Sequence, residues 1–283
     1  MKASRKRRFP LGNSFGVMQG RLSQQTERGY QSFPWESWEE EFETAAELGL
    51  EHIEWVLDSF DIDVNPLMVN PAIVNKNSSH SGISIPSVCA DFLMNTPLVS
   101  SEKEVWERFS FMLAGMEEVG AQIAVIPCVD QSSILVPANY ANLVASLPKA
   151  LQLASDHSVQ LALEADLPPN YFLSLLTEFE AEGLKVNYDS GNSSSLGYDF
   201  DTEVRTYGHL ISDFHLKDRP FGGGSVRLGD GGADFPSIIR YLKESEFHGV
   251  ITVQAMRDPE GLGVLKSQLD WLETISAQGI QIG

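Results

Sequence analysis

From residue 15 onward the chain alternates strand-like and helix-like segments, and no serine- or proline-rich linker divides it. The segments expected as strands are 15–19, 52–56, 85–89, 123–127, 160–165, 185–188, 211–216 and 250–254. Those expected as helices are 38–48, 66–80, 101–119, 139–155, 171–181, 201–208, 235–245 and 263–278. This alternation predicts an α/β protein, a single (β/α)8 TIM barrel over residues 15–283. Residues 1–14 form a basic tail that we expect to be disordered or loosely packed.

The individual segments support this fold class. In the segment 101–119, apolar residues recur at helical spacing, and Ser101 and Glu104 can form a capping box. Residues 123–127 are apolar throughout, as expected for a strand of a parallel sheet covered on both faces. An open doubly wound sheet is the alternative, but no G-x-G-x-x-G follows the first strand. Polar residues also recur at the strand ends, which favours the barrel.

Charge and cysteine content limit the partners and the compartment. Lys and Arg number 20 against 39 Asp and Glu, a formal net charge of −19, so nucleic-acid backbones and anionic membranes are not expected as partners. The two cysteines do not form a disulfide framework, which indicates a reducing, cytoplasmic environment. The basic N-terminal residues precede no long apolar run, so neither a secretory signal nor a membrane span is expected.

Polar side chains stand near the ends of the last four predicted strands. Glu164, Asp189, His215 and Gln254 occupy these positions. Because the C-terminal strand ends of a TIM barrel face the active site, the fold predicts that the four side chains converge. A neutral imidazole and carboxylates suit a divalent metal ion. The alternative for His215 is a hydrogen-bonded histidine of the core.

Four further residues are candidates for contact with a substrate. Glu54 ends the second strand and either faces a substrate or is a solvated or salt-bridged loop residue. Lys217, Arg219 and Arg257 follow the seventh and eighth strands and can bind a phosphate or a carboxylate. The alternative for Arg219 is a structural ion pair with Asp218 or Asp258.

An ordered set of motifs resembles the xylose-isomerase-like barrels. The set consists of GVMQGRL near the first strand, LALEAD around Glu164, NYDSGN around Asp189, FHLKDR around His215, and LGDGGADF. It is most similar to the sugar phosphate isomerases and epimerases, a group that includes tagatose/psicose 3-epimerases and hydroxypyruvate isomerase. Endonuclease IV is a more distant relative, and its three-metal chemistry needs more ligands than this acidic chain with six histidines offers.

The resemblance implies a site for one divalent ion, Mn²⁺ or Mg²⁺ in preference, with Zn²⁺ also compatible. Carried over position by position, the implied ligands are Glu164, Asp189, His215 and Gln254. The last position differs, because the family has a glutamate there. A glutamine carbonyl can bind a metal but adds no negative charge, so weaker cation binding is expected.

The same substitution affects the implied chemistry. In the 3-epimerases two glutamates exchange protons with the substrate, and they correspond to Glu164 and Gln254. An amide cannot act as a base near neutral pH. Asn192 likewise stands where the family often has histidine; it can bind a substrate hydroxyl but cannot carry a proton. One-base isomerisation with Glu164 as the base therefore remains the favoured reaction.

Three functions are consistent with these residues. The first is a metal-dependent isomerase or epimerase of a small sugar, sugar phosphate or hydroxy-keto acid that acts through an enediolate. The second is a dehydratase or lyase acting on a related polyol, for which one base and one metal suffice. The third is a non-catalytic carbohydrate-binding barrel. Members of the resembled family often form homo-oligomers, but no feature of this chain decides its oligomeric state.

Overall fold

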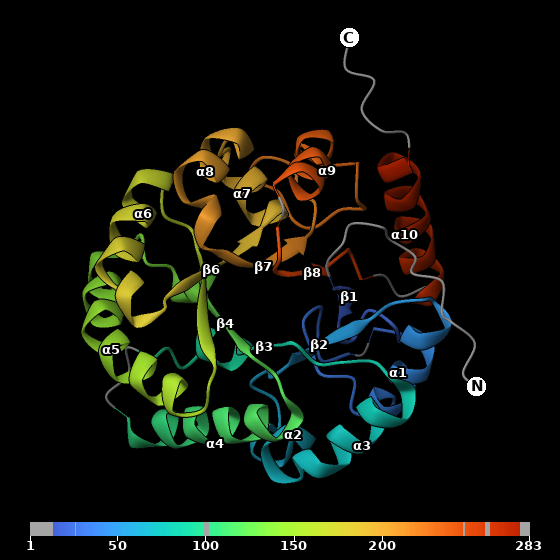
Figure 1. Ribbon diagram of the computed structural model, residues 1–283, viewed down its shortest axis with the longest axis horizontal. Coiled ribbons are helices and arrows are strands. Elements are labelled where there is room, and N and C mark those ends of the chain that lie inside the picture. The colour runs from blue at the N-terminus through green and yellow to red at the C-terminus, as the bar shows by residue number, and fades with distance from the viewer. Residues whose placement is uncertain (1–13, 26, 99–101, 246, 258–260, 278–283) are drawn as a thin grey trace.

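A closed barrel of parallel strands forms the centre of the molecule (Figure 1). The computed structural model describes residues 14–25, 27–98, 102–245, 247–257 and 261–277. The strands follow the chain order around the barrel, and β8 closes it by pairing with β1. They are β1 (Phe15–Met18), β2 (His52–Val56), β3 (Ser87–Cys89), β4 (Ile123–Cys128), β5 (Gln160–Ala165), β6 (Lys185–Asp189), β7 (Ile211–Leu216) and β8 (Val250–Val253). The predicted (β/α)8 barrel is confirmed.

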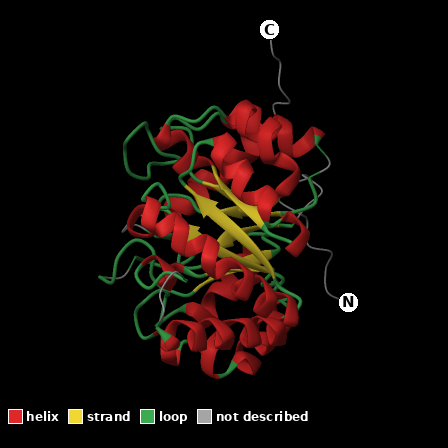
Figure 2. Cartoon of the chain, turned by 90° about the vertical axis from the view of Figure 1, so that its left-hand side faces the viewer, coloured by secondary structure: helices red, strands yellow, loops and turns green. Residues whose placement is uncertain are grey.

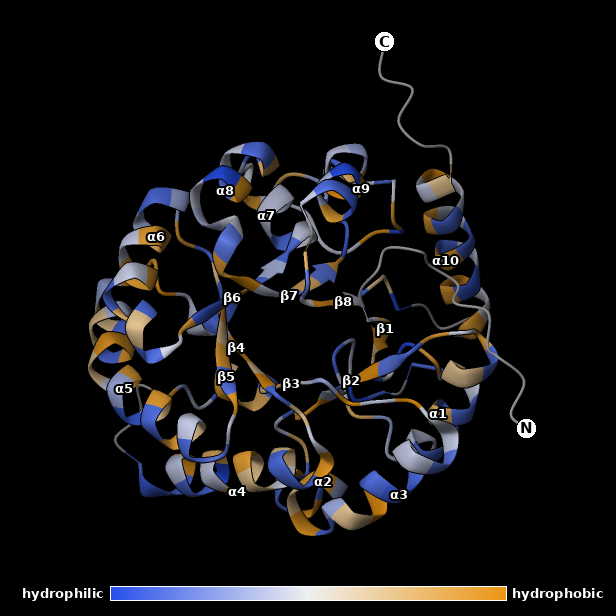
Figure 3. Ribbon diagram, viewed as in Figure 1, coloured by the Kyte–Doolittle hydropathy of each residue, from blue (hydrophilic) through white to orange (hydrophobic). Residues whose placement is uncertain are grey.

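Helices surround the barrel as an outer ring (Figures 1 and 2). They are α1 (Trp38–Glu47), α2 (Pro66–Val69), α3 (Pro71–Ser81), α4 (Lys103–Val119), α5 (Pro137–Asp156), α6 (Pro169–Glu178), α7 (Ser190–Leu196), α8 (Phe200–Tyr207), α9 (Phe235–Glu244) and α10 (Leu262–Ala277). Hydrophilic and hydrophobic residues are interleaved along them (Figure 3), as expected for helices with one buried side. Among the described helices, none has the length and apolarity that crossing a bilayer requires.

Two helical segments differ from the prediction. The predicted helix 66–80 is divided, because the backbone of Asn70 leaves the helical region and Pro71 begins α3. Helix α7 was not predicted, since its sequence SGNSSSL has weak helix propensity. Its start is stabilised by Asp189, whose Oδ1 accepts hydrogen bonds from the backbone N–H groups of Gly191 and Asn192 at 2.9 Å each. Residues 1–13 and the predicted cap Ser101 lie outside the described residues.

Successive side chains along each strand point to opposite faces of the sheet, and the two faces have different surroundings. One set of strand side chains, for example Trp55, Leu163 and Phe214, packs into the large core that includes the helices. Strand neighbours of these residues belong to the other face of the sheet, where Val56 and Ala162 are part of a smaller apolar cluster. The polar candidate residues fall on this second face. The barrel interior is therefore apolar in one part and polar in another.

Candidate active site

Three of the candidate side chains come together on consecutive strands. Glu164 lies on β5, Asp189 ends β6 and His215 lies on β7, directly beside Asp189 in the strand register. One ligand atom from each residue lies within 4.8 Å of the other two. The three residues are 6%, 4% and 0% exposed, respectively. The predicted convergence therefore holds for these three residues, and they can together bind a cation.

The carboxylate of Glu164 is held by two amides. Asn187 Nδ2 donates to Glu164 Oε2 at 3.0 Å, and Asn192 Nδ2 donates to Glu164 Oε1. Burial, followed by the charge of Asp189, raises the pKa of Glu164 to about 7. A carboxyl group with this pKa can both take up and release a proton near neutral pH.

Asn192 connects Glu164 to two cations. Its Oδ1 accepts hydrogen bonds from Lys217 Nζ at 3.2 Å and from Arg219 Nη1 at 2.7 Å. Since both donors contact the oxygen, the amide nitrogen must face Glu164. Lys217 Nζ also lies 3.2 Å from Asp189 Oδ2. Although burial disfavours the ammonium, Asp189 and Glu164 raise the pKa of Lys217. The predicted residues Asn192, Lys217 and Arg219 therefore belong to one network with Glu164 and Asp189.

Glu54 has partners inside the barrel. Its Oε1 lies 2.9 Å from His215 Nε2, and both side chains are 0% exposed. Its Oε2 accepts a hydrogen bond from Ser87 Oγ at 2.7 Å. Although burial lowers the pKa of His215, the carboxylate of Glu54 reverses the effect and raises it to about 10. These contacts differ from those expected of a substrate-facing residue and indicate that Glu54 orients His215.

Asp213 also belongs to this group, although it is not among the site residues predicted from the sequence. It precedes His215 by two residues on β7, and its ligand atoms and those of Glu54 and His215 also lie within 4.8 Å of one another. Burial and the charge of Glu54 raise the pKa of Asp213 well above its usual range. Protonated Asp213 can donate to Glu54, whereas Glu54 itself stays ionised beside His215.

Gln254 follows β8, and its backbone N–H donates to Leu216 O at 3.0 Å. The residue is 5% exposed, and its side-chain Oε1 has no hydrogen-bond partner in the part of the chain that the structure describes. A buried amide oxygen without a hydrogen-bond partner can serve as a fourth, neutral metal ligand. Two carboxylates, an imidazole and an amide oxygen form a donor set that suits Mn²⁺, Mg²⁺ or Zn²⁺.

Arg257 has partners other than those expected of a substrate-binding residue. Its Nη1 donates to Ser32 O at 3.2 Å, and its Nη2 donates to Gln24 O at 3.1 Å. Burial lowers its pKa to about 10. The residue therefore fastens the loop between β1 and α1 to the end of β8, and these two nitrogens are already engaged.

The glycine-rich segment after β7 is anchored by Asp218. Its Oδ2 accepts from the backbone N–H groups of Gly229 and Gly231 at 2.9 Å each, and its Oδ1 accepts from Ala233 at 3.0 Å. A side chain at Gly231 would overlap the Asp218 carboxylate. The glycine at this position is thus required by a close approach of the backbone to a buried charge.

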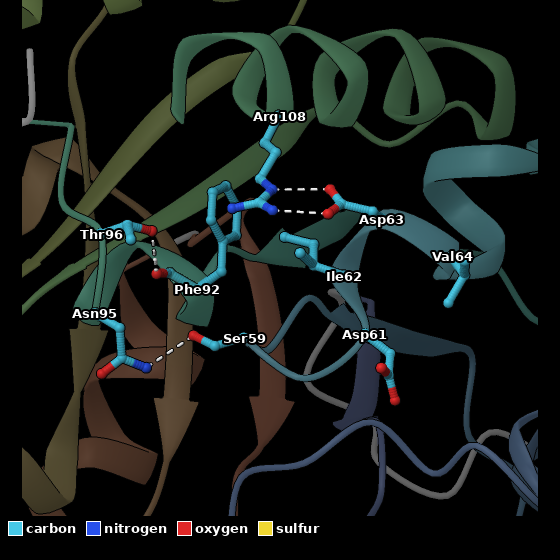
Figure 4. Close-up of a pocket in the computed structure, with 9 residues that line it drawn as sticks. All are labelled: Ser59, Asp61, Ile62, Asp63, Val64, Phe92, Asn95, Thr96 and Arg108. Carbon is cyan, nitrogen blue, oxygen red and sulfur yellow. Dashed lines mark hydrogen bonds and ion pairs between the residues drawn. The ribbon is translucent and has the colours of Figure 1, made fainter. Parts of the chain in front are cut away.

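A separate pocket of about 430 Å³ lies outside this network (Figure 4). It is formed by the segments after β2 and β3 and by α4, and Arg108 there binds Asp63 through two hydrogen bonds of 2.8 and 2.7 Å. Its lining residues are Ser59, Asp61, Ile62, Asp63, Val64, Phe92, Asn95, Thr96 and Arg108. None of the predicted site residues is among them.

Three solved structures similar to this chain carry titles that name an epimerase, a protein with a bound zinc atom and a probable dehydratase. The 3-keto-D-glucoside 4-epimerase of E. coli has a TM-score of 0.69 and 16% identity, covering 92% of this chain and 99% of that one. The IolI protein with a bound zinc atom has a TM-score of 0.70 and 15% identity, covering 95% and 100%. The probable 3-DHS dehydratase AsbF of Bacillus anthracis has a TM-score of 0.68 and 14% identity, covering 92% and 98%. At these identities the likeness establishes the fold.

Sequence comparison agrees with the fold and adds the family. An uncharacterized protein of Methanocaldococcus jannaschii is 21% identical over 124 residues, so the match spans only 42% of that protein and 40% of this chain. The profile of the family described as Xylose isomerase-like TIM barrel matches residues 42–275, which include all the candidate site residues. This chain therefore belongs to the Xylose isomerase-like TIM barrel family.

Proposed function

We propose that the protein is a metal-dependent isomerase or epimerase of a small sugar, sugar phosphate or hydroxy-keto acid, with Glu164 as the base. The cluster of Glu164, Asp189 and His215 carries this proposal, because a proton acceptor with a pKa of about 7 lies among groups that can hold a cation. The family and the similar epimerase structure support the same class of reaction.

In this proposal the residues of the site have separate roles. A divalent ion bound by Glu164, Asp189, His215 and Gln254 would polarise the substrate carbonyl and stabilise the enediolate. Glu164 takes the proton from the carbon beside the carbonyl. The amides of Asn187 and Asn192 fix the plane of its carboxylate, and each oxygen keeps a second lone pair.

The amide of Gln254 favours reactions that need one base. Glu164 alone can move a proton between adjacent carbons on one face of an enediolate, which is aldose–ketose isomerisation. It can also begin the elimination of water, so a dehydratase or lyase is the second candidate, and the similar structure of a probable dehydratase agrees with it. Loss of the acidic fourth ligand likewise suits a non-catalytic carbohydrate-binding barrel.

Deuterium incorporation distinguishes these candidates. The protein is stripped with chelator, resupplied with Mn²⁺, and incubated in D₂O with D-allulose, D-tagatose, hydroxypyruvate and the corresponding ketose phosphates. The isomerase proposal predicts deuterium at a carbon beside the carbonyl, with the mass otherwise retained, and no exchange in the chelated protein. Loss of water would favour the dehydratase. Turnover that appears only after Gln254→Glu would identify the natural protein as a binder.

A further inference from the structure

The loop after β1 brings the phenol of Tyr30 to the end of β8, where the neutral Gln254 stands. Tyr30 Oη donates a hydrogen bond to the carbonyl of Ala255 at 3.2 Å, and Ala255 directly follows Gln254. The phenol thus lies at the end of β8, beside the position of the amide that cannot carry a proton.

We propose that Tyr30 is a catalytic proton donor that acts with Glu164 on opposite faces of one substrate carbon. This role rests on the proposed function and extends it, because it restores epimerisation to a site with one carboxylate base. Its substrates are ketoses or keto acids with a hydroxyl-bearing carbon beside the carbonyl.

Contacts from the segments that follow β1 and β8 hold the phenol in place. The guanidinium of Arg21, three residues beyond β1, lies 4.7 Å from the centre of the Tyr30 ring. Arg21 is itself tied to the end of β8 by a hydrogen bond from Nε to Ala255 O at 3.3 Å. Arg257 Nη1 lies 3.4 Å from the backbone carbonyl of Tyr30. The ring is therefore fixed over the junction of β8 and β1.

The charges around the phenol favour its ionised form. Burial alone raises the pKa of Tyr30, but the positive charges of Arg21 and Lys217 outweigh it, and the pKa is lowered. Arg257 is a third cation that interacts with the phenol, and a hydrogen bond with Ser225 lowers its pKa further. A phenolate formed during the reaction would thus be stabilised where it forms.

Lys217 links the phenol to the carboxylates. Its ammonium interacts electrostatically with Tyr30 as well as with Asp189 and Glu164. In the closed strand order β5 lies four strands from β1 in either direction, so Glu164 and the β1 side stand across the barrel from each other. A small substrate near Lys217 would therefore meet Glu164 and Tyr30 from different sides.

The proton balance closes without a further reactant. Glu164 removes the proton from one face of the carbon, and the electron pair moves to the carbonyl oxygen. When the carbonyl reforms, the carbon takes the Tyr30 proton on its other face, and the phenolate remains beside Arg21 and Lys217. Exchange with water then returns a proton to Tyr30 and removes one from Glu164.

The variant Tyr30→Phe tests the proposal, because it keeps the ring and removes only the hydroxyl. With Mn²⁺-loaded protein and the ketose panel in D₂O, epimer formation should fall by about 10²–10⁴-fold. Deuterium exchange into recovered substrate through Glu164 should persist. Tyr171→Phe is the matched control, since Tyr171 is 68% exposed, and should behave as the wild type.

A second measurement does not depend on turnover. The near-ultraviolet absorbance of phenolates, followed against pH in the stripped protein, should show one tyrosine ionising at lower pH than the others. Tyr30→Phe should lose this step, and Tyr171→Phe should keep it.

Each remaining outcome is decisive. A wild type that catalyses no exchange on any substrate overturns the proposed function and the role of Tyr30 with it. A wild type that exchanges but forms no epimer overturns the role of Tyr30 alone. The same holds if Tyr30→Phe epimerises at the wild-type rate or leaves the phenolate titration unchanged.

Discussion

The two sides of the barrel mouth differ in the kind of charge they carry. On the side of β5, β6 and β7, Glu164, Asp189 and His215 bring their ligand atoms within 4.8 Å of one another. On the side of β8 and β1, the phenol of Tyr30 lies against the guanidinium of Arg21 and donates to the carbonyl of Ala255, the residue after the neutral Gln254. The first side suits cation binding and proton removal, and the second suits proton donation. The roles proposed for Glu164 and Tyr30 assign proton removal to the first side and proton donation to the second.

Among the changes considered, replacing the base Glu164 should reduce deuterium exchange the most. Glu164→Gln keeps the size of the side chain and abolishes its proton transfer, so deuterium exchange should fall by about 10²–10⁴-fold. Glu182→Gln, at an exposed position in the short 3-10 helix before β6, is the matched control. Exchange at the wild-type rate in Glu164→Gln would remove Glu164 from the chemistry.

The carboxylate behind His215 should affect metal affinity. Glu54→Gln removes the negative charge at 2.9 Å from His215 Nε2, so the imidazole is oriented less firmly and is a poorer ligand. Affinity for Mn²⁺, measured by calorimetry, should fall by about 10–100-fold. Ser87→Ala removes only one hydrogen bond to Glu54 and should shift the affinity less, in the same direction. Unchanged binding in Glu54→Gln would return Glu54 to a purely structural role.

Protons compete with the metal ion for the side chains of the acidic side, so metal affinity should depend on pH. In the metal-free protein, His215 with a pKa of about 10 is protonated at neutral pH, and Glu164 with a pKa of about 7 is protonated below that pH. Metal binding must displace these protons, so affinity rises with pH. The expected slope is about tenfold per unit for each proton displaced, steeper below pH 7 than above it. Calorimetry in buffers of different ionisation enthalpy counts the released protons; no release would contradict this account.

Placing a carboxylate at position 254, on the other side, should change Mn²⁺ affinity the least. Gln254→Glu adds a charged ligand and should strengthen Mn²⁺ binding by about tenfold. Without metal, the buried charge should lower the free energy of unfolding by about 1–3 kcal/mol. Thermal unfolding with and without Mn²⁺ measures both changes. A variant that is destabilised equally in both conditions would place residue 254 away from the ion.

The fold and part of the site follow from simple periodicities of the sequence. The alternation of segments predicted the barrel, and the positions of Glu164, Asp189 and His215 near strand ends predicted that they meet. The period of two could also have identified Asn187 and Asp213, because each precedes a site residue by two positions and so faces the same interior.

Other features depend on packing that no local pattern reveals. Glu54 looked like a strand-end residue, yet its contact with His215 spans the barrel interior. Arg257 looked free for an anion, yet it binds carbonyls of a loop more than 200 positions away. Tyr30 lies in an irregular loop, where neither period nor propensity predicts the direction of a side chain. Long-range contacts of this kind are set by the closed barrel.

Anomalous diffraction from crystals grown with Mn²⁺ locates the metal ion directly. We predict one ion within bonding distance of Glu164, Asp189 and His215, with Gln254 as its fourth protein ligand. His215 also belongs to a second group that could hold an ion, with Glu54 and Asp213. The same anomalous map shows which of the two groups binds the ion. An ion held by Glu54 and Asp213 instead, or no ion at saturating Mn²⁺, would contradict the account.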